Sequence, residues 1–330
     1  MGNRGAKKVA RLRSPPSIFL LRTSPVWGGR RAKCYILGDQ CEDNLRPLIA
    51  GNWRMNGLMS HLGEVEAVVT AVAAKPRMAD VLICTPPTLI ARAAQIAAGR
   101  IEIGGQDCHS AMAGAFTGDI SAEMLKDAGA SAVIVGHSER RQHHGETDAT
   151  VAAKADAAWR AGLLVIICIG ETRAQRREGA ALSVCGEQLA GSMPDGGTVS
   201  ARAVAYEPLW AIGSGQTPNS EQIVEMHAHI RHCLEERLGT EGREVPILYG
   251  GSVNPSNAHD ILALPEVGGA LVGGGGLNAA DFNAIVDAVP KSSWPSPAGR
   301  GMAPLIRVPP ADVRLPRHEI VLNRKEFGFY

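Results

Sequence analysis

The chain has 330 residues, of which 45% are hydrophobic and 20% charged, and its net charge is +1. A near-neutral chain with 4% aromatic residues lacks the basic surface and stacking platforms of a nucleic-acid-binding protein. No apolar run reaches the roughly 18 residues of a membrane-spanning helix, so no membrane partner is expected. Seven cysteines without a C-x-x-C pair indicate neither a disulfide framework nor a zinc ribbon, and they favour a reducing, cytoplasmic setting.

The composition divides the chain into three parts. Residues 1–45 are rich in arginine and lysine and contain no acidic residue before Asp39. Such a start is typical of an organelle transit peptide, but a disordered extension or an over-long gene prediction is the preferred interpretation. Residues 291–330 are rich in proline and are expected to form an irregular tail. Region 46–290 is expected to be a single catalytic domain.

Region 46–290 alternates short β-branched runs with amphipathic helical segments. The expected strands are 47–50, 81–84, 101–104, 132–135, 163–169, 203–206, 246–249 and 270–272. The expected helices include 64–74, 147–161, 220–238 and 279–289, and Thr147 and Asn278 are candidate capping residues. Eight such units in roughly 245 residues predict a closed parallel (β/α)8 barrel. The alternative is an open doubly wound sheet, which is weakened because no G-x-G-x-x-G turn follows the first strand.

Four short motifs follow the predicted strands. They occupy residues 50–56, 135–141 and 205–215, and the fourth combines 249–253 with 272–276. In a (β/α)8 barrel the active site is built from the loops at the carboxyl ends of the strands. The motifs therefore predict one site at that end of the barrel.

Glu207 directly follows the sixth predicted strand and precedes Pro208. A carboxylate there can act as a general base if a dry pocket raises its pKa. A solvated loop glutamate is the simpler interpretation of this residue alone. The following residues favour catalysis, because the small, apolar, glycine-containing segment 211–215 lies between two proline-containing stretches and is typical of a closing lid.

His137 lies between Gly136 and Ser138 at the end of the fourth predicted strand. A neutral imidazole could donate a hydrogen bond to a substrate oxygen as negative charge develops. We expect residues 138–141 to begin a short helix, whose amino terminus would disfavour the imidazolium. A histidine satisfied within the core is the simpler interpretation, and the position at a strand end favours function.

The first and last motifs supply groups that can bind an anion. Asn52 can donate a neutral hydrogen bond, and Arg54 can offset the charge of a phosphate or an enediolate, although a surface ion pair is its simpler role. The glycines at 250–251 and 273–276 can turn backbone N–H groups toward an anion. Tight turns also need glycine, but the two clusters match the phosphate site expected after strands seven and eight.

Two other features are expected to be structural. His227, His229 and His232 lie within one predicted helix beside Cys233, but only His229 and His232 share a face. No H-E-x-x-H pattern is present, so no metal is expected. Cys168 in the fifth predicted strand is expected to be a buried apolar residue.

The stretch 46–290 resembles the triosephosphate isomerases over its whole length. The resemblance rests mainly on A-Y-E-P-L-W-A-I-G at 205–213, G-H-S-E-R-R at 136–141 and Y-G-G-S-V at 249–253. Residues 105–109 and 114–121 are similar to the family's third loop, which reaches into a partner subunit. The resemblance thus implies a TIM barrel, a homodimer, a role in glycolysis and gluconeogenesis, and no cofactor or metal.

The resemblance also implies a reaction, the interconversion of dihydroxyacetone phosphate and glyceraldehyde 3-phosphate. Glu207 would move a proton between two substrate carbons, and neutral His137, in the role that a histidine has in this family, would polarise the carbonyl. Asn52 would hydrogen-bond a substrate oxygen, and Glu139 would order the cation after strand one. The phosphate would be held by Gly213, Ser252, Gly273 and Gly274, with water excluded by the lid.

Two departures from the family pattern stand out. Arg54 replaces a lysine, and the exchange is not conservative at a shaped site because the guanidinium is a larger, planar group. We therefore expect a slow isomerase. The usual G-G-A-S after strand eight is G-G-G-G at 273–276, which predicts a looser loop. Two alternatives remain open, a catalytically silent relative that binds a phosphorylated ligand or a partner protein, and another sugar-phosphate enzyme on the same barrel.

Overall fold

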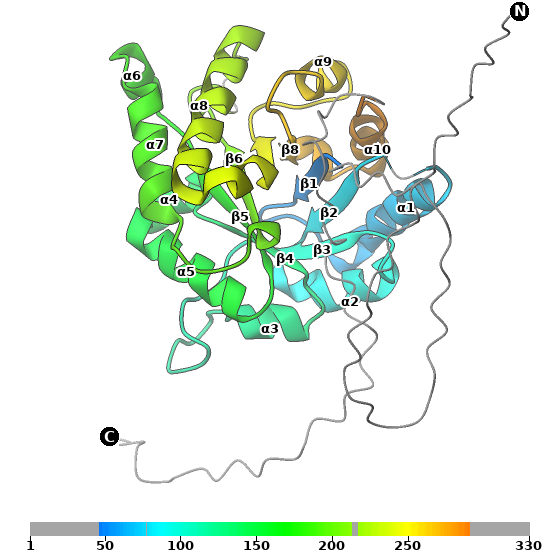
Figure 1. Cartoon of the computed structure of the whole chain (residues 1–330). Coiled ribbons are helices and arrows are strands. Elements are labelled where there is room, and N and C mark those ends of the chain that lie inside the picture. The colour runs from blue at the N-terminus through cyan, green and yellow to red at the C-terminus, as the bar shows by residue number, and fades with distance from the viewer. Residues whose placement is uncertain (1–45, 77, 213–216, 291–330) are drawn as a thin grey trace, which may run out of the picture. The chain divides into compact units, whose positions relative to one another are not determined.

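The computed structural model describes residues 46–76, 78–212 and 217–290 (Figure 1). Eight parallel strands close into a barrel in sequence order, with β8 paired to β1. The strands are β1 Leu48–Asn52, β2 Asp80–Cys84, β3 Glu102–Gly105, β4 Ala132–Val135, β5 Leu164–Ile169, β6 Arg202–Tyr206, β7 Ile247–Tyr249 and β8 Gly269–Val272. The predicted closed barrel is confirmed, and the open-sheet alternative is wrong. The predicted extensions, 1–45 and 291–330, lie outside the described residues.

Helices surround the strands (Figure 1). The longer ones are α1 Leu62–Ala73, α2 Pro87–Ala97, α5 Asp148–Arg160, α7 Ala181–Ser192, α8 Ser220–Leu238 and α10 Ala279–Asp287. The shorter ones are α3 Ala122–Asp127, α4 Ser138–His144, α6 Arg173–Arg177 and α9 Ala258–Leu262, with 3-10 turns η1 Met59–His61, η2 Val199–Ala201, η3 Gly239–Glu244 and η4 Gly274–Gly276. The two predicted caps are confirmed, because Thr147 accepts from the N–H of Thr150 and Asn278 from that of Ala280.

Two apolar layers hold the barrel together. One layer fills its interior with side chains such as Ala50, Leu82, Ile166 and Leu248, and the predicted buried Cys168 belongs to it. The larger layer lies between the strands and the helices. Because side chains fill the interior, the barrel is a packed core that presents its strand ends as a rigid platform.

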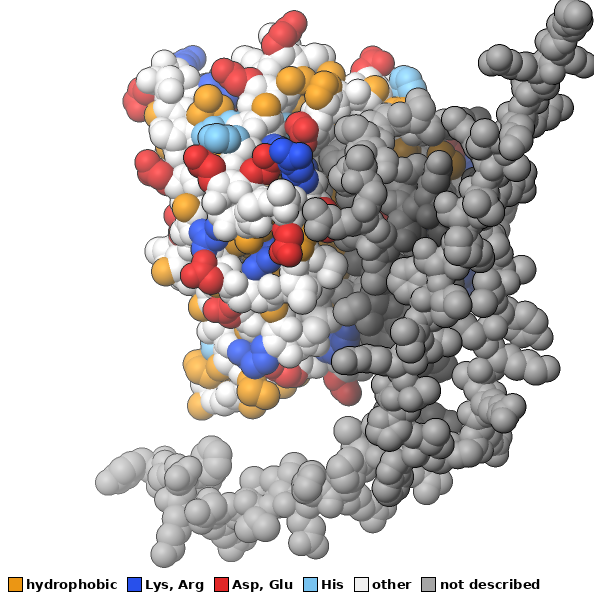
Figure 2. Space-filling model, viewed as in Figure 1, with side chains coloured by type: hydrophobic (Ala, Val, Ile, Leu, Met, Phe, Trp, Pro, Cys, Tyr) orange, Lys and Arg blue, Asp and Glu red, His pale blue; other side chains and the backbone are white. Residues whose placement is uncertain are grey.

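The described surface carries mixed charge. On the face drawn in Figure 2, acidic and basic side chains are interspersed. This pattern agrees with the near-neutral sequence. Among the helices of the described residues, none is both long enough and apolar enough to cross a bilayer.

Candidate active site

The barrel brings the predicted site residues to one end, because all eight strands run in the same direction. Asn52 is the last residue of β1, His137 is the second residue after β4, and Glu207 directly follows β6. All three side chains are buried. Such burial at strand ends is unusual for polar groups, and it is typical of an active site.

Three donors hold the Glu207 carboxylate. The backbone N–H of Ser138 donates to Oε2 at 2.9 Å, its hydroxyl donates to Oε1 at 3.2 Å, and Nε2 of His137 lies 2.9 Å from Oε1. Burial raises the pKa of Glu207, but the contacts with His137 and Ser138 lower it by more than burial raises it. The pKa of Glu207 therefore lies below its usual value. The prediction that a dry pocket raises the pKa of Glu207 is therefore wrong for this arrangement of the site.

His137 is the residue before α4, and its ring connects two glutamates. Nδ1 accepts from the backbone N–H of Glu139 at 3.3 Å, so the proton of a neutral ring lies on Nε2, facing Glu207. Burial lowers the pKa of His137, but the carboxylates of Glu207 and Glu139 outweigh burial and raise the pKa above its usual value. The expected suppression of the imidazolium by α4 is thus overridden while Glu207 remains in contact.

Arg54, in the segment after β1, pairs with Glu139 in the first turn of α4. Its Nε donates to Oε1 of Glu139 at 2.6 Å, as the predicted link between these residues requires. Its backbone lies in the left-handed region, with φ of 55°, and its N–H donates to Oδ1 of Asn52 at 3.2 Å. A non-glycine residue in this region carries strain, and such strain is commonly found at functional sites.

The predicted phosphate residues come from three segments. Ser252 is exposed after β7, and Gly273 and Gly274 follow β8, where Gly274 begins η4. Gly213 lies outside the described residues. The N–H of Gly276 donates to the carbonyl of Gly273 at 2.8 Å, and the indole of Trp53 donates to the carbonyl of Gly276 at 2.9 Å. The glycine run forms a 3-10 turn that is bonded to Trp53, the residue after β1, and the looser loop that the sequence predicts stays a prediction.

Glu171 is a site residue that sequence analysis missed. It is fully buried in the segment between β5 and α6, and it accepts from Tyr206 Oη at 3.1 Å and from Trp210 Nε1 at 2.7 Å. Arg176 also donates to it, at 3.0 Å. Glu171 therefore anchors the start of the predicted lid. Sequence alone gave no signal, because Glu171 is far along the chain from Trp210.

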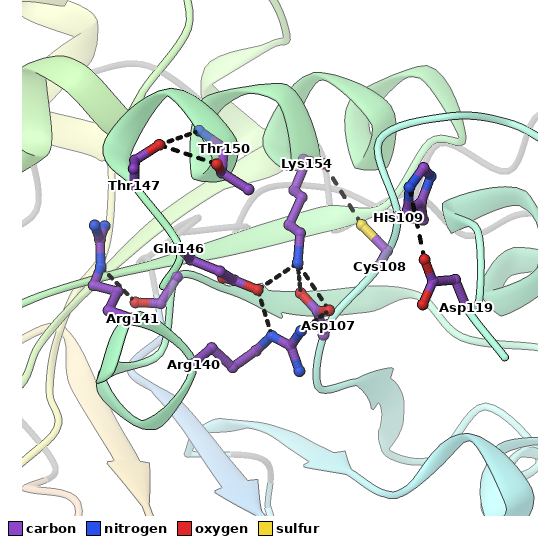
Figure 3. A network of polar contacts seen from close by, with 11 residues as sticks. Asp107, Cys108, His109, Asp119, Arg140, Arg141, Glu146, Thr147, Thr150 and Lys154 are labelled. Atoms are coloured by element: carbon purple, nitrogen blue, oxygen red, sulfur yellow. Dashed lines mark hydrogen bonds and ion pairs between the residues drawn. The ribbon is translucent and has the colours of Figure 1, made fainter. Parts of the chain in front are cut away.

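A network of ion pairs joins α4 and α5 to the segment between β3 and α3 (Figure 3). Lys154 lies between Asp107 and Glu146, at 2.7 Å and 2.5 Å. Arg140 pairs with the same two carboxylates, at 2.8 Å and 2.6 Å. Lys154 and Glu146 are buried, so the network fixes α4 and α5 against the segment after β3 by charge pairing in a low dielectric.

The histidines of α8 have separate partners. His227 is buried and contacts the carbonyl of Glu266, whereas His229 lies beside Cys233 and His232 pairs with Glu236. In the described part of the chain, no group of three or more His, Cys, Asp or Glu side chains is arranged to hold a metal ion.

Known proteins resemble this chain in sequence and in structure. The triosephosphate isomerase family model matches residues 47–289. A triosephosphate isomerase of Afipia carboxidovorans is 59% identical over 247 residues, which cover 74% of this chain and 98% of that protein. One of Rhodopseudomonas palustris is 56% identical over 249 residues, with the same coverage. The crystal structure of triosephosphate isomerase from Bartonella henselae is 49% identical, covers 74% of this chain and 98% of its own, and superimposes with a TM-score of 0.69. The chain therefore belongs to the triosephosphate isomerase family.

Proposed function

We propose that this isomerase interconverts dihydroxyacetone phosphate and glyceraldehyde 3-phosphate, with Glu207 as the base. The observation that carries the proposal is the buried contact of 2.9 Å between Glu207 and His137. It joins a proton acceptor to a hydrogen-bond donor, and a hydroxy-carbonyl isomerisation needs both. Family membership supports a triose phosphate as the substrate.

Glu207 must leave Ser138 before it can act. Held by Ser138 and His137, its carboxylate has a lowered pKa and is a weak base. When it turns to the substrate it loses these donors but stays in a dry site, and both changes raise its pKa. The carboxylate then removes a proton from the carbon beside the carbonyl and returns it to the neighbouring carbon. No redox cofactor or metal is required for this balance.

His137 stabilises the oxygen on which charge develops. When Glu207 moves away, the ring loses the nearby carboxylate that raises its pKa, and burial, which lowers that pKa, dominates. The neutral ring donates its Nε2 proton to the substrate oxygen, while Nδ1 is fixed by the N–H of Glu139. The same motion thus strengthens the base and keeps the imidazole neutral.

The remaining predicted residues bind and orient the substrate. Asn52 supplies a neutral donor, Arg54 supplies a cation and Glu139 orients Arg54 through the 2.6 Å contact. Ser252, Gly273 and Gly274, with Gly213 from the lid, are proposed to receive the phosphate. Exclusion of water by the lid prevents loss of phosphate from the enediolate.

The test is isomerisation of glyceraldehyde 3-phosphate by the purified chain. Glu207→Gln is expected to reduce kcat by at least about a hundredfold, whereas Glu221→Gln at the start of α8 is the matched control. Arg54→Lys is expected to raise kcat, because it restores the compact ammonium that the family has at this position. If the parent chain is folded but inactive and Arg54→Lys is active, the site is disabled at position 54 alone. If neither protein is active, the chain is a catalytically silent relative that binds a phosphorylated ligand or a partner protein.

A homodimer is the proposed assembly, supported by the exposed apolar side chains. Met55 is 98% exposed and Leu58 68% in the segment after β1, and Met112 and Phe116 are exposed between β3 and α3. Monomeric proteins rarely leave such groups in water unless they bind a partner. Light scattering should give twice the 34.8 kDa of one chain. Met112→Asp is expected to halve that mass and Met124→Asp, on α3, to preserve it.

The cytoplasm is the proposed location. The five cysteines in the described residues, Cys84, Cys108, Cys168, Cys185 and Cys233, are all free thiols. Free thiols are typical of a reducing compartment. Cell fractionation followed by immunoblotting would test the location, and recovery in a membrane or organelle fraction would contradict it.

A further inference from the structure

Arg54 lies directly over the backbone of Gly273. A Cβ added at Gly273 would lie 2.2 Å from Nη1 of Arg54 and 3.0 Å from both Cζ and Nη2. Real Cβ atoms do not approach another atom to 2.2 Å, so any side chain at 273 would displace the guanidinium. The position of Arg54 therefore depends on glycine at a residue more than two hundred positions away along the chain.

Both sides of this contact are fixed. Nε of Arg54 is bound to Glu139, which orients the guanidinium plane and leaves the two Nη groups at the glycine turn. On the other side, the bond from Trp53 to the carbonyl of Gly276 fixes the turn to the end of β1. Gly276 lies against Gly51, since a Cβ added at 276 would be 3.1 Å from its Cα.

We propose that the Arg54 guanidinium packs on the backbone of Gly273 because that residue has no side chain. Held there by Glu139, Arg54 binds the substrate's phosphate with both Nη groups. The proposal rests on the proposed function for the identity of the substrate. Neither Nη group of Arg54 has a hydrogen-bond partner among the described residues, and the two groups match two oxygens of a phosphate, whereas a lysine supplies a point charge. A lysine side chain has a single nitrogen, so lysine at 54 could not use one nitrogen for Glu139 and two others for phosphate.

Gly273 thereby gains a role besides its backbone N–H. It is a positioning residue whose missing side chain admits the arginine. Substitutions at 54 and 273 are then coupled, because a methyl group at 273 harms phosphate binding through Arg54. With lysine at 54, the same methyl group displaces no planar group and harms binding less.

The test is calorimetric titration of inorganic phosphate into four proteins: the parent chain, Gly273→Ala, Arg54→Lys and the double variant. Loss of a charge-assisted hydrogen bond weakens binding by about tenfold or more, and this loss is expected for Gly273→Ala in the arginine background. In the lysine background the expected loss is at most about threefold. Equal fold losses in the two backgrounds would overturn the proposal.

Gly274→Ala is the matched control, because a Cβ there meets nothing within 4 Å. Its effect on phosphate affinity is expected to be the same with arginine or lysine at 54. If Gly273→Ala fails to fold, Glu139→Gln replaces it in the same cycle. Release of Nε should then weaken phosphate binding with arginine at 54 and have less effect with lysine, and equal effects would overturn the proposal.

Phosphate titration needs no turnover, so it separates this proposal from the proposed function. Coupling between 54 and 273 without isomerisation would overturn the proposed function alone. Isomerisation without coupling between 54 and 273 would overturn only the proposal that Arg54 packs on Gly273 and binds phosphate there. Glu207→Gln is expected to reduce kcat by at least about a hundredfold and still bind phosphate, since Glu207 is not among the groups that hold Arg54.

Discussion

Ser138 binds Glu207 twice. Its backbone N–H donates to one carboxylate oxygen at 2.9 Å and its hydroxyl to the other at 3.2 Å. Both bonds stabilise the ionised carboxylate, so together with His137 they lower the pKa of the group proposed to act as the base. In the proposed mechanism Glu207 must leave Ser138 before it acts, so the hydroxyl of Ser138 should set the pH at which the free enzyme loses its base.

Ser138→Ala removes the hydroxyl and keeps the N–H bond, so the pKa of Glu207 in the free enzyme should rise. The acidic limb of kcat/KM reports that pKa and should move to higher pH, because ionised Glu207 is required. Measurement of kcat/KM against pH checks the shift. Ser183→Ala, an exposed serine of α7, is the control. An unchanged acidic limb would show that the hydroxyl has no hold on Glu207.

Gly170→Ala should destabilise the barrel and displace Glu207. A Cβ at 170 would lie 1.9 Å from the carbonyl oxygen of Glu207 and 2.7 Å from Cδ1 of Leu209, and a backbone oxygen cannot move aside as a side chain can. Overpacking of this kind costs about 1–3 kcal/mol. We expect a lower free energy of unfolding and a lower kcat together.

Gly63→Ala is the opposite case. Gly63 lies in α1, and a Cβ there meets nothing within 4 Å. Replacing glycine by alanine inside a helix should stabilise the protein by about 0.5–1 kcal/mol. Urea unfolding of both variants checks the pair, and equal effects on stability would contradict the contact argument.

Sequence predicted the parts of this molecule that depend on local pattern. The closed barrel, the caps Thr147 and Asn278, and the placement of Asn52, His137 and Glu207 at strand ends followed from periodicity and motif position. The strand boundaries were less accurate. For example, β1 runs to Asn52, because pairing with β2 extends it beyond its β-prone residues.

Sequence could not predict relationships between distant segments. The lowered pKa of Glu207 depends on His137 and on Ser138, which is 69 residues away, and the anchor of Trp210 depends on Glu171, 39 residues away. The fit of Arg54 over Gly273 depends on the absence of a side chain at the residue that follows β8. Such contacts are set by barrel closure, which no local pattern encodes.

Lys154→Met should cost about 3 kcal/mol of stability near neutral pH, because it leaves the buried Glu146 and the half-buried Asp107 with one cation. Burial raises the pKa of Glu146, but Lys154 and Arg140 lower it more, so its net pKa is below its usual value. That contribution exists above the unfolded pKa and disappears as the pH falls through the folded one. The difference from the parent chain should thus shrink in acid.

Urea unfolding of Lys154→Met at several pH values checks this. Lys75→Met is the control, since Lys75 pairs with Asp287 at 2.5 Å in an exposed position. An exposed pair contributes at most about 1 kcal/mol. A Lys154→Met deficit that is equally small, or that grows in acid, would contradict the role assigned to the network.

His227 should make the fold sensitive to acid. It is fully buried on α8 beside Tyr206 and Tyr249, with Nδ1 at 3.1 Å from the carbonyl of Glu266. Burial lowers its pKa from 6.5 to about 4, so between these values the unfolded chain binds a proton that the folded chain does not. Stability therefore falls as the pH drops through this window, by up to about 3 kcal/mol.

His227→Asn removes the titrating ring and can keep a donor to Glu266. Its free energy of unfolding should fall less than that of the parent chain between about pH 7 and about pH 4.5, because one source of proton uptake is gone. His259→Asn, an exposed histidine of α9, controls for the loss of an imidazole. If His227→Asn and the parent chain lose the same stability across this range, His227 is not what makes the barrel acid-sensitive. If only His227→Asn loses less stability in acid, the buried neutral ring of His227 beside Tyr206 and Tyr249 is the source of the acid sensitivity.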